Sequence, residues 1–126
     1  MAKPILLHSA AELLQRILSE KIPADRQMEG YFRTHRDMGV RDRGFVAETV
    51  YGCLRERRWL EHIAGSALLL DVVAAYLLTH GYSARALEES GFRGDARATA
   101  ERARTLEKSS LPVAIQANMA DWLAER

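Results

Sequence analysis

The stretch "RDRGFVAETVYGCLRERRWLEH", residues 41–62, has the pattern of a long amphipathic helix with basic ends. At 100° per residue, its apolar face gathers Phe45, Val46, Thr49, Val50, Cys53 and Leu60. We expect a helix that is capped by Asp42, runs to about His62 and buries this face in a core. The opposite side carries Glu48, Tyr51, Arg55, Arg58 and His62, which should meet water or a partner.

Two small residues within this stretch bear on packing. Gly52 costs about 1 kcal/mol relative to alanine inside a helix, so we expect a neighbouring helix to approach closely there, with a functional glycine as the alternative. Cys53 lies inside the apolar stripe, where a thiol behaves as a small buried hydrophobe rather than as a nucleophile. A single cysteine excludes an internal disulfide and a cysteine-based metal cluster, which favours a reducing, cytoplasmic location.

Two helices are predicted on the N-terminal side of this stretch. Ser9 and Glu12 have the spacing of a capping box, and the helix they would open ends before Pro23. Pro23 is suited to begin a second helix, which would stop at Gly39.

Three helices are predicted on the C-terminal side. Residues 66–81 are apolar nearly all round, which indicates a central helix surrounded by others. Residues 83–90 form a short helix, and residues 95–108 form one rich in alanine and charge, with little apolar stripe, which we expect at the periphery. The sequence therefore predicts an all-α, compact helical bundle with a near fully apolar central helix.

Charge and hydropathy limit the partners. The chain has 126 residues, enough for one domain, and a net charge of only +1. Fifteen of the 18 basic residues are arginine, and residues 33–58 hold seven of them against four acidic residues, an excess of +3 (7 − 4). The most apolar run, residues 67–78, is shorter than the ~20 residues that span a bilayer and contains Asp71, so no membrane partner is expected.

The basic residues of this region have two interpretations. In the first, the side chains pair locally on a solvated surface, where each pair is worth ~0–1 kcal/mol. Alternatively they converge on phosphates, which the planar guanidinium binds through two parallel hydrogen bonds. The candidate RNA-binding set is Arg33, Arg36, Arg41, Arg43, Arg55, Arg58 and His62.

No motif in the chain predicts catalysis. The sequence has no glycine-rich dinucleotide loop, no P-loop lysine, no nucleophile elbow and no histidine pair at helical metal-site spacing. We therefore assign it no catalytic residue, no cofactor site and no metal site.

Arg57 and Asp71 are charges on otherwise apolar faces. They either pair across a helix interface, or Arg57 extends past its helix end while Asp71 faces outward.

The run from Gly39 to Arg55 resembles a known family. Its matching positions are Gly39, Asp42, Arg43, Phe45, Val46, Val50, Tyr51, Gly52, Leu54 and Arg55. They are similar to the N-terminal, NusB-like helical domain of the bacterial Fmu/Sun (NOL/NOP/Sun) RNA methyltransferases. Residues 111–126, "LPVAIQANMADWLAER", resemble the segment that leads to the family's catalytic domain, whereas residues 81–108 depart from its pattern.

The resemblance implies an enzyme that methylates ribosomal RNA at carbon 5 of cytosine with S-adenosylmethionine. The paired cysteines of that chemistry belong to a catalytic domain, and Cys53 does not match them. Residues 1–126 would then be the RNA-binding accessory domain, ending where the connection to the catalytic domain begins. Its partners would be ribosomal RNA and its own C-terminal methyltransferase domain, and S-adenosylmethionine would bind only to the full-length parent. The alternatives are a free-standing NusB-like antitermination factor and a helical protein-interaction domain.

Overall fold

The computed structural model describes residues 5–108, which form helices and no strand. The predicted all-α fold is confirmed. Residues 111–126, which resemble a connection to a catalytic domain, lie outside the described residues. The helices are α1 Leu7–Ser19, α2 Ala24–Thr34, α3 Val40–Arg55, α4 Arg57–Ala64, α5 Leu69–Thr79, α6 Ala84–Glu89 and α7 Ala96–Lys108.

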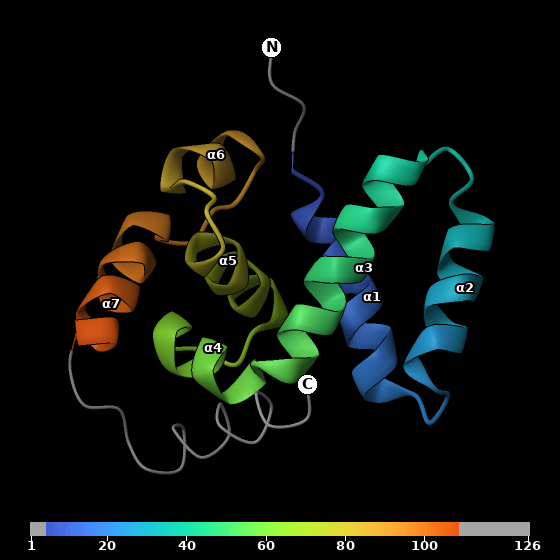
Figure 1. The fold of residues 1–126 in the computed structure, drawn as a ribbon, viewed down its shortest axis with the longest axis horizontal. Helices are drawn as coiled ribbons and strands as arrows, with labels where there is room; N and C mark the ends of the chain where they lie inside the picture. The colour runs from blue at the N-terminus through green and yellow to red at the C-terminus, as the bar shows by residue number, and fades with distance from the viewer. Residues whose placement is uncertain (1–4, 109–126) are drawn as a thin grey trace.

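The central helix is α5, and α1, α3, α4 and α7 all pack against it (Figure 1). Six consecutive residues, 72–77, are buried, as expected for a helix enclosed on all sides. Ser66 does not cap this helix directly, because its hydroxyl accepts from the Leu68 N–H in the preceding turn. Gly81, at φ 98°, ends it, and the Tyr82 N–H then reaches back to the Leu77 carbonyl at 3.0 Å.

The long helix predicted from Asp42 to about His62 is wrong in its bounds. It begins at Val40, with Gly39 as N-cap, and the chain leaves helical geometry at Glu56, where φ is −108° and ψ is 18°. A separate helix, α4, follows and ends at Gly65 in the left-handed conformation. Trp59 is buried together with Leu60 and Ile63 on α4, which packs on α5. The wheel of one continuous helix did not place Trp59 in the core.

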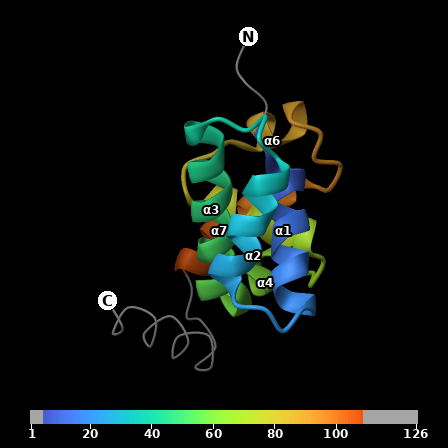
Figure 2. The ribbon, with the colours of Figure 1, turned by 90° about the vertical axis from the view of Figure 1, so that its right-hand side faces the viewer.

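The N-terminal helix α1 packs against both α3 and α5, and α2 packs on α1. The predicted capping box is wrong, because α1 begins at Leu7 and Glu12 instead pairs with Arg16 at 3.3 Å. Helix α2 follows Pro23 as expected but ends at Thr34 rather than Gly39. It packs on α1 and lies in front of α1 and α3 when that side of the molecule is viewed (Figure 2).

The last two helices are capped as their sequences suggest. Ser83 accepts from the Ala86 N–H at 3.0 Å, and Asp95 accepts from the Ala98 N–H at 2.9 Å. Helix α7 lies at the edge of the molecule yet packs directly on α4, α5 and α6. Its buried positions are small: Ala96, Thr99 and Ala103. Small side chains let the helices approach closely, so α7 needs no large apolar stripe.

Hydrogen bonds from one arginine side chain also link α7 to α4. The Arg102 guanidinium donates to the Ile63 and Ala64 carbonyls, at 2.7 and 2.9 Å, where α4 ends. The last carbonyls of a helix have no partner within the helix, so a basic side chain there stabilises the terminus.

Of the two alternatives for Arg57 and Asp71, the ion pair across a helix interface does not form. Arg57 Nε lies 3.2 Å from the Glu61 carboxylate one turn further along α4. A partner four residues away on the same helix is reached without bringing either charge into the core.

Within residues 5–108, no single helix is long and apolar enough to cross a membrane, and the apolar pair α4–α5 is bent by 97°.

Candidate nucleic-acid interface

The seven candidate RNA-binding side chains are all exposed, and they fall into two groups. The α2–α3 corner comprises Arg33 and Arg36 at the end of α2 and Arg41 and Arg43 at the start of α3. The α4 group comprises Arg55 at the end of α3 and Arg58 and His62 on α4. Helix α3 has 16 residues, so at 1.5 Å per residue its ends are ~24 Å apart. The structure therefore does not bring the seven side chains to one place.

The two groups differ in the partners that they already have. In the α2–α3 corner, Arg33 pairs with Glu29 at 2.8 Å, and Arg36 Nε donates to the Arg33 carbonyl at 3.3 Å. Arg41 and Arg43 make no ion pair or hydrogen bond through their side chains within residues 5–108. Arg58 in the α4 group is likewise unpaired there, whereas Arg55 has an interaction. Arg41, Arg43 and Arg58 keep their donors available for a ligand.

The backbone adds to the positive potential at the α2–α3 corner. Gly39 provides no side-chain cap to α3, so the first N–H groups of the helix are not satisfied by a cap. The positive end of the helix dipole therefore coincides with Arg41 and Arg43, and Asp42 in the same turn offsets part of it.

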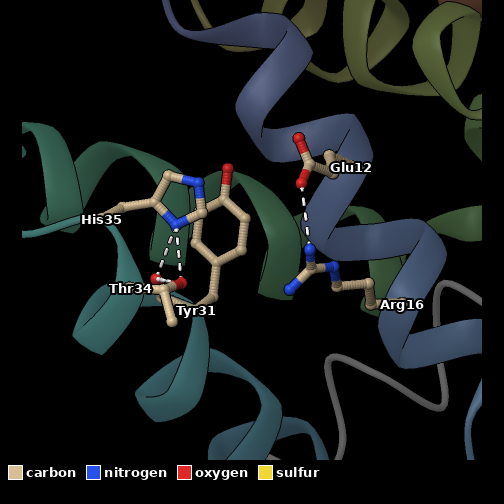
Figure 3. Close-up of polar contacts among 5 residues, drawn as sticks. All are labelled: Glu12, Arg16, Tyr31, Thr34 and His35. Carbon is tan, nitrogen blue, oxygen red and sulfur yellow. Dashed lines mark hydrogen bonds and ion pairs between the residues drawn. The ribbon is translucent and has the colours of Figure 1, made fainter.

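An aromatic contact fixes the end of α2 and thereby the corner. The His35 ring stacks on Tyr31 with centroids 3.9 Å apart, and its Nδ1 lies 2.7 Å from the Tyr31 carbonyl oxygen. The Arg16 guanidinium, from α1, lies 5.5 Å from the Tyr31 ring centroid (Figure 3). Burial raises the pKa of the Tyr31 hydroxyl. These contacts order the end of α2 and place Tyr31 against α1.

Most of the residues that carry the family resemblance serve packing. Val46, Val50 and Gly52 are buried, and Tyr51 and Leu54 are half-buried against the core. A Cβ on Gly52 would lie 2.1 Å from Tyr76 Cε1, so only glycine admits the Tyr76 ring at this position. The predicted close approach of a neighbouring helix at Gly52 is confirmed.

A groove that the sequence did not indicate lies beside this contact. It has a volume of about 230 Å³ and is called here the α3–α5 groove. Its lining residues are Phe45, Glu48, Thr49, Tyr76, Leu77, His80 and Tyr82. Tyr76 lies on α5 and His80 directly follows this helix, both 27 or more residues beyond Thr49, so no local pattern could have grouped them.

Cys53 is buried, as expected from its place in the apolar stripe. Burial, with a smaller contribution from the nearby Glu56 carboxylate, raises the pKa of its thiol from 9.0 to about 12. Because the thiolate is the nucleophilic form, this side chain is unsuited to attack a base.

The raised pKa of Cys53 predicts a loss of stability in alkali. The folded state holds its thiol proton more tightly than the unfolded state, so this contribution is complete below pH 9 and is lost as the pH rises toward 12. We expect the free energy of unfolding to fall by up to ~1.4 kcal/mol per pH unit in that range. Urea unfolding at pH 8–11 should show a shallower fall for Cys53→Ala. Tyr31 and Tyr76, whose pKa values burial also raises, are present in both proteins. Parallel curves would contradict the assignment.

Comparison with known proteins leaves the chain without a matching family model, curated protein or solved structure. Within residues 5–108, no group of three His, Cys, Asp or Glu side chains could hold a metal ion.

Proposed function

We propose that this domain binds RNA through the α2–α3 corner and serves as the accessory domain of an S-adenosylmethionine-dependent rRNA (cytosine-5) methyltransferase. The observation that carries the RNA-binding part is the pair of exposed, unpaired guanidiniums, Arg41 and Arg43, at a helix N-terminus without a side-chain cap. Guanidiniums and helix N-termini both bind phosphate oxygens. The resemblance of residues 39–55 to the NusB-like domain of the Fmu/Sun enzymes supports the methyltransferase part.

The domain contributes placement of RNA rather than chemistry. The described part consists of helices and has no strand–loop–helix unit suited to the cofactor of such an enzyme. With a net charge of +1, binding depends on a local cluster and should be weak and largely tolerant of sequence, with Kd on the order of 10⁻⁴–10⁻⁶ M at physiological salt.

A protein-interaction domain is the second candidate, and one surface favours it. Leu68 is 70% exposed beside a groove of about 560 Å³ that is lined by α1 and the start of α5. Leu68 adjoins the half-buried Leu69 and Leu70 in this lining, and an apolar patch over a groove is a feature of helix and peptide docking surfaces. A free-standing NusB-like antitermination factor would use the same corner as the methyltransferase domain, so the RNA experiment below applies to both.

The double variant Arg41→Ala/Arg43→Ala should weaken binding to an rRNA hairpin by roughly tenfold or more, because two phosphate contacts are lost. The slope of log K against log salt should become shallower by ~1.4–1.8, at 0.7–0.9 per contact. Fluorescence anisotropy at several salt concentrations measures both quantities.

A matched control separates the corner from net charge. Arg85→Ala/Arg104→Ala removes the same charge from α6 and α7, where each arginine already pairs with a glutamate of its own helix. We expect a small change in affinity for this control. Equal losses in the two double variants, or no loss in either, would contradict the proposed interface.

A further inference from the structure

Thr49 and Tyr76, which line the α3–α5 groove, each carry a hydroxyl without a hydrogen-bond partner in the described part of the chain. Thr49 is 2% exposed and Tyr76 is 5% exposed, and neither side chain makes a hydrogen bond within residues 5–108. No fully enclosed side-chain polar atom lacks a partner in that part of the chain, so both hydroxyls keep contact with solvent.

Thr49 differs in this respect from the other described threonines. Thr34, Thr79, Thr99 and Thr105 each donate to a backbone carbonyl three or four residues earlier, at 2.9–3.0 Å. Such a bond was open to Thr49, which also lies within a helix, and the structure does not form it. A nearly buried hydroxyl without a protein partner needs water or a ligand to satisfy it.

The second hydroxyl is held in place by its surroundings. Gly52 lets the Tyr76 ring lie against the backbone of α3. The ring also packs on His80, with centroids 4.1 Å apart, and His80 Nε2 lies 3.3 Å from the Glu56 carboxylate. These contacts restrain both Tyr76 and His80 before any ligand arrives.

The rest of the lining supplies a carboxylate and an aromatic surface. Glu48 is exposed, and its carboxylate has no partner within the described residues. The Phe45 and Tyr82 rings meet edge to face, with centroids 6.0 Å apart, and Tyr82 is 37% exposed. The groove thus offers hydrogen-bond acceptors and donors beside a partly exposed ring.

This combination fits a flat heterocycle that carries an amino group. A carboxylate accepts from the exocyclic amine of a base, hydroxyls pair with its ring nitrogen and carbonyl, and an aromatic ring stacks on its face. A space of about 230 Å³ is suited to one base and is too small for a base pair. Arg41 precedes Glu48 by two helical turns on the same side of α3, ~10 Å away, where a neighbouring phosphate would lie.

We propose that the α3–α5 groove binds a single unpaired nucleobase with an exocyclic amino group. This inference rests on the proposed RNA-binding function and adds base preference to it. Phosphate contacts at the α2–α3 corner position the strand, and the groove reads one base of it.

Two measurements on the full chain test the groove. In the first, anisotropy compares single-stranded hexamers of cytidine and uridine, which share a backbone and differ at the amino group. We expect about tenfold tighter binding of the cytidine hexamer. Thr49→Val and Glu48→Ala should each reduce this preference to about threefold or less while leaving the affinity for the uridine hexamer nearly unchanged. Tyr82→Ala should weaken the binding of both hexamers, because stacking on an aromatic ring is tolerant of base identity.

Thr105→Val is the matched control, because its hydroxyl already bonds to the Glu101 carbonyl outside the groove. It should leave the preference intact. Circular dichroism melting confirms that each variant is folded, and any single variant that fails to fold leaves the other two to decide.

In the second measurement, NMR follows amide shifts of the groove residues during titration with cytidine, uridine or N-acetylarginine amide. Shifts with cytidine alone support the inference. If they occur while the affinity for RNA does not depend on Arg41 and Arg43, the groove proposal holds and the proposed interface is contradicted. Equal binding of the two hexamers, with binding still dependent on Arg41 and Arg43, would refute the groove and leave the interface. Shifts with the arginine amide in place of cytidine would assign the groove to a protein partner and overturn the inference.

Discussion

The Gly52→Ala variant should be less stable than the wild type by about 1–3 kcal/mol, although alanine is the better helix former. Its methyl group would lie 2.1, 2.4 and 2.6 Å from Cε1, Cζ and the hydroxyl oxygen of Tyr76. The ring is 5% exposed and packed on His80, so it cannot turn away without disturbing the contact between α3 and α5. Thermal unfolding followed by circular dichroism measures the effect, with ~4–8 °C of Tm expected per kcal/mol.

Gly44 provides the control on the same helix. An alanine Cβ there meets no atom within 4 Å, so Gly44→Ala should stabilise the protein by up to ~1 kcal/mol through helix propensity alone. Opposite signs for the two substitutions would show that tertiary packing selects glycine at position 52. A Gly52→Ala protein at least as stable as the wild type would disprove the close approach.

The Trp59→Ala variant should lose ~3–5 kcal/mol, the usual cost of truncating a buried aromatic side chain. Trp59 is 5% exposed and packs in the core with Leu60 and Ile63. The neighbouring Arg58→Ala variant removes an exposed side chain and should change the stability by no more than ~0.5 kcal/mol. Urea unfolding of both variants provides the comparison, and near-equal stabilities would contradict the burial of Trp59.

The candidate interface could be predicted from the sequence only in part. The arginines are charged and lie off the apolar face, so their exposure followed from helical periodicity. Their division into two groups did not, because it depends on the length of α3 and on the direction in which α4 leaves it. The α3–α5 groove could not be predicted, because only the packing of two helices brings Thr49 and Tyr76 together.

The sequence by itself determined the all-α class, the enclosed central helix, the places of α6 and α7, and the burial of Cys53. Each of these follows from a pattern within one helix or one turn, where apolar periodicity and capping residues act over a few positions. The tertiary structure decided the break at Glu56, the burial of Trp59 and the seating of α7 through Ala96, Thr99 and Ala103. Those features depend on packing between helices that are far apart in the chain. No pattern of neighbouring residues within one helix predicts such packing.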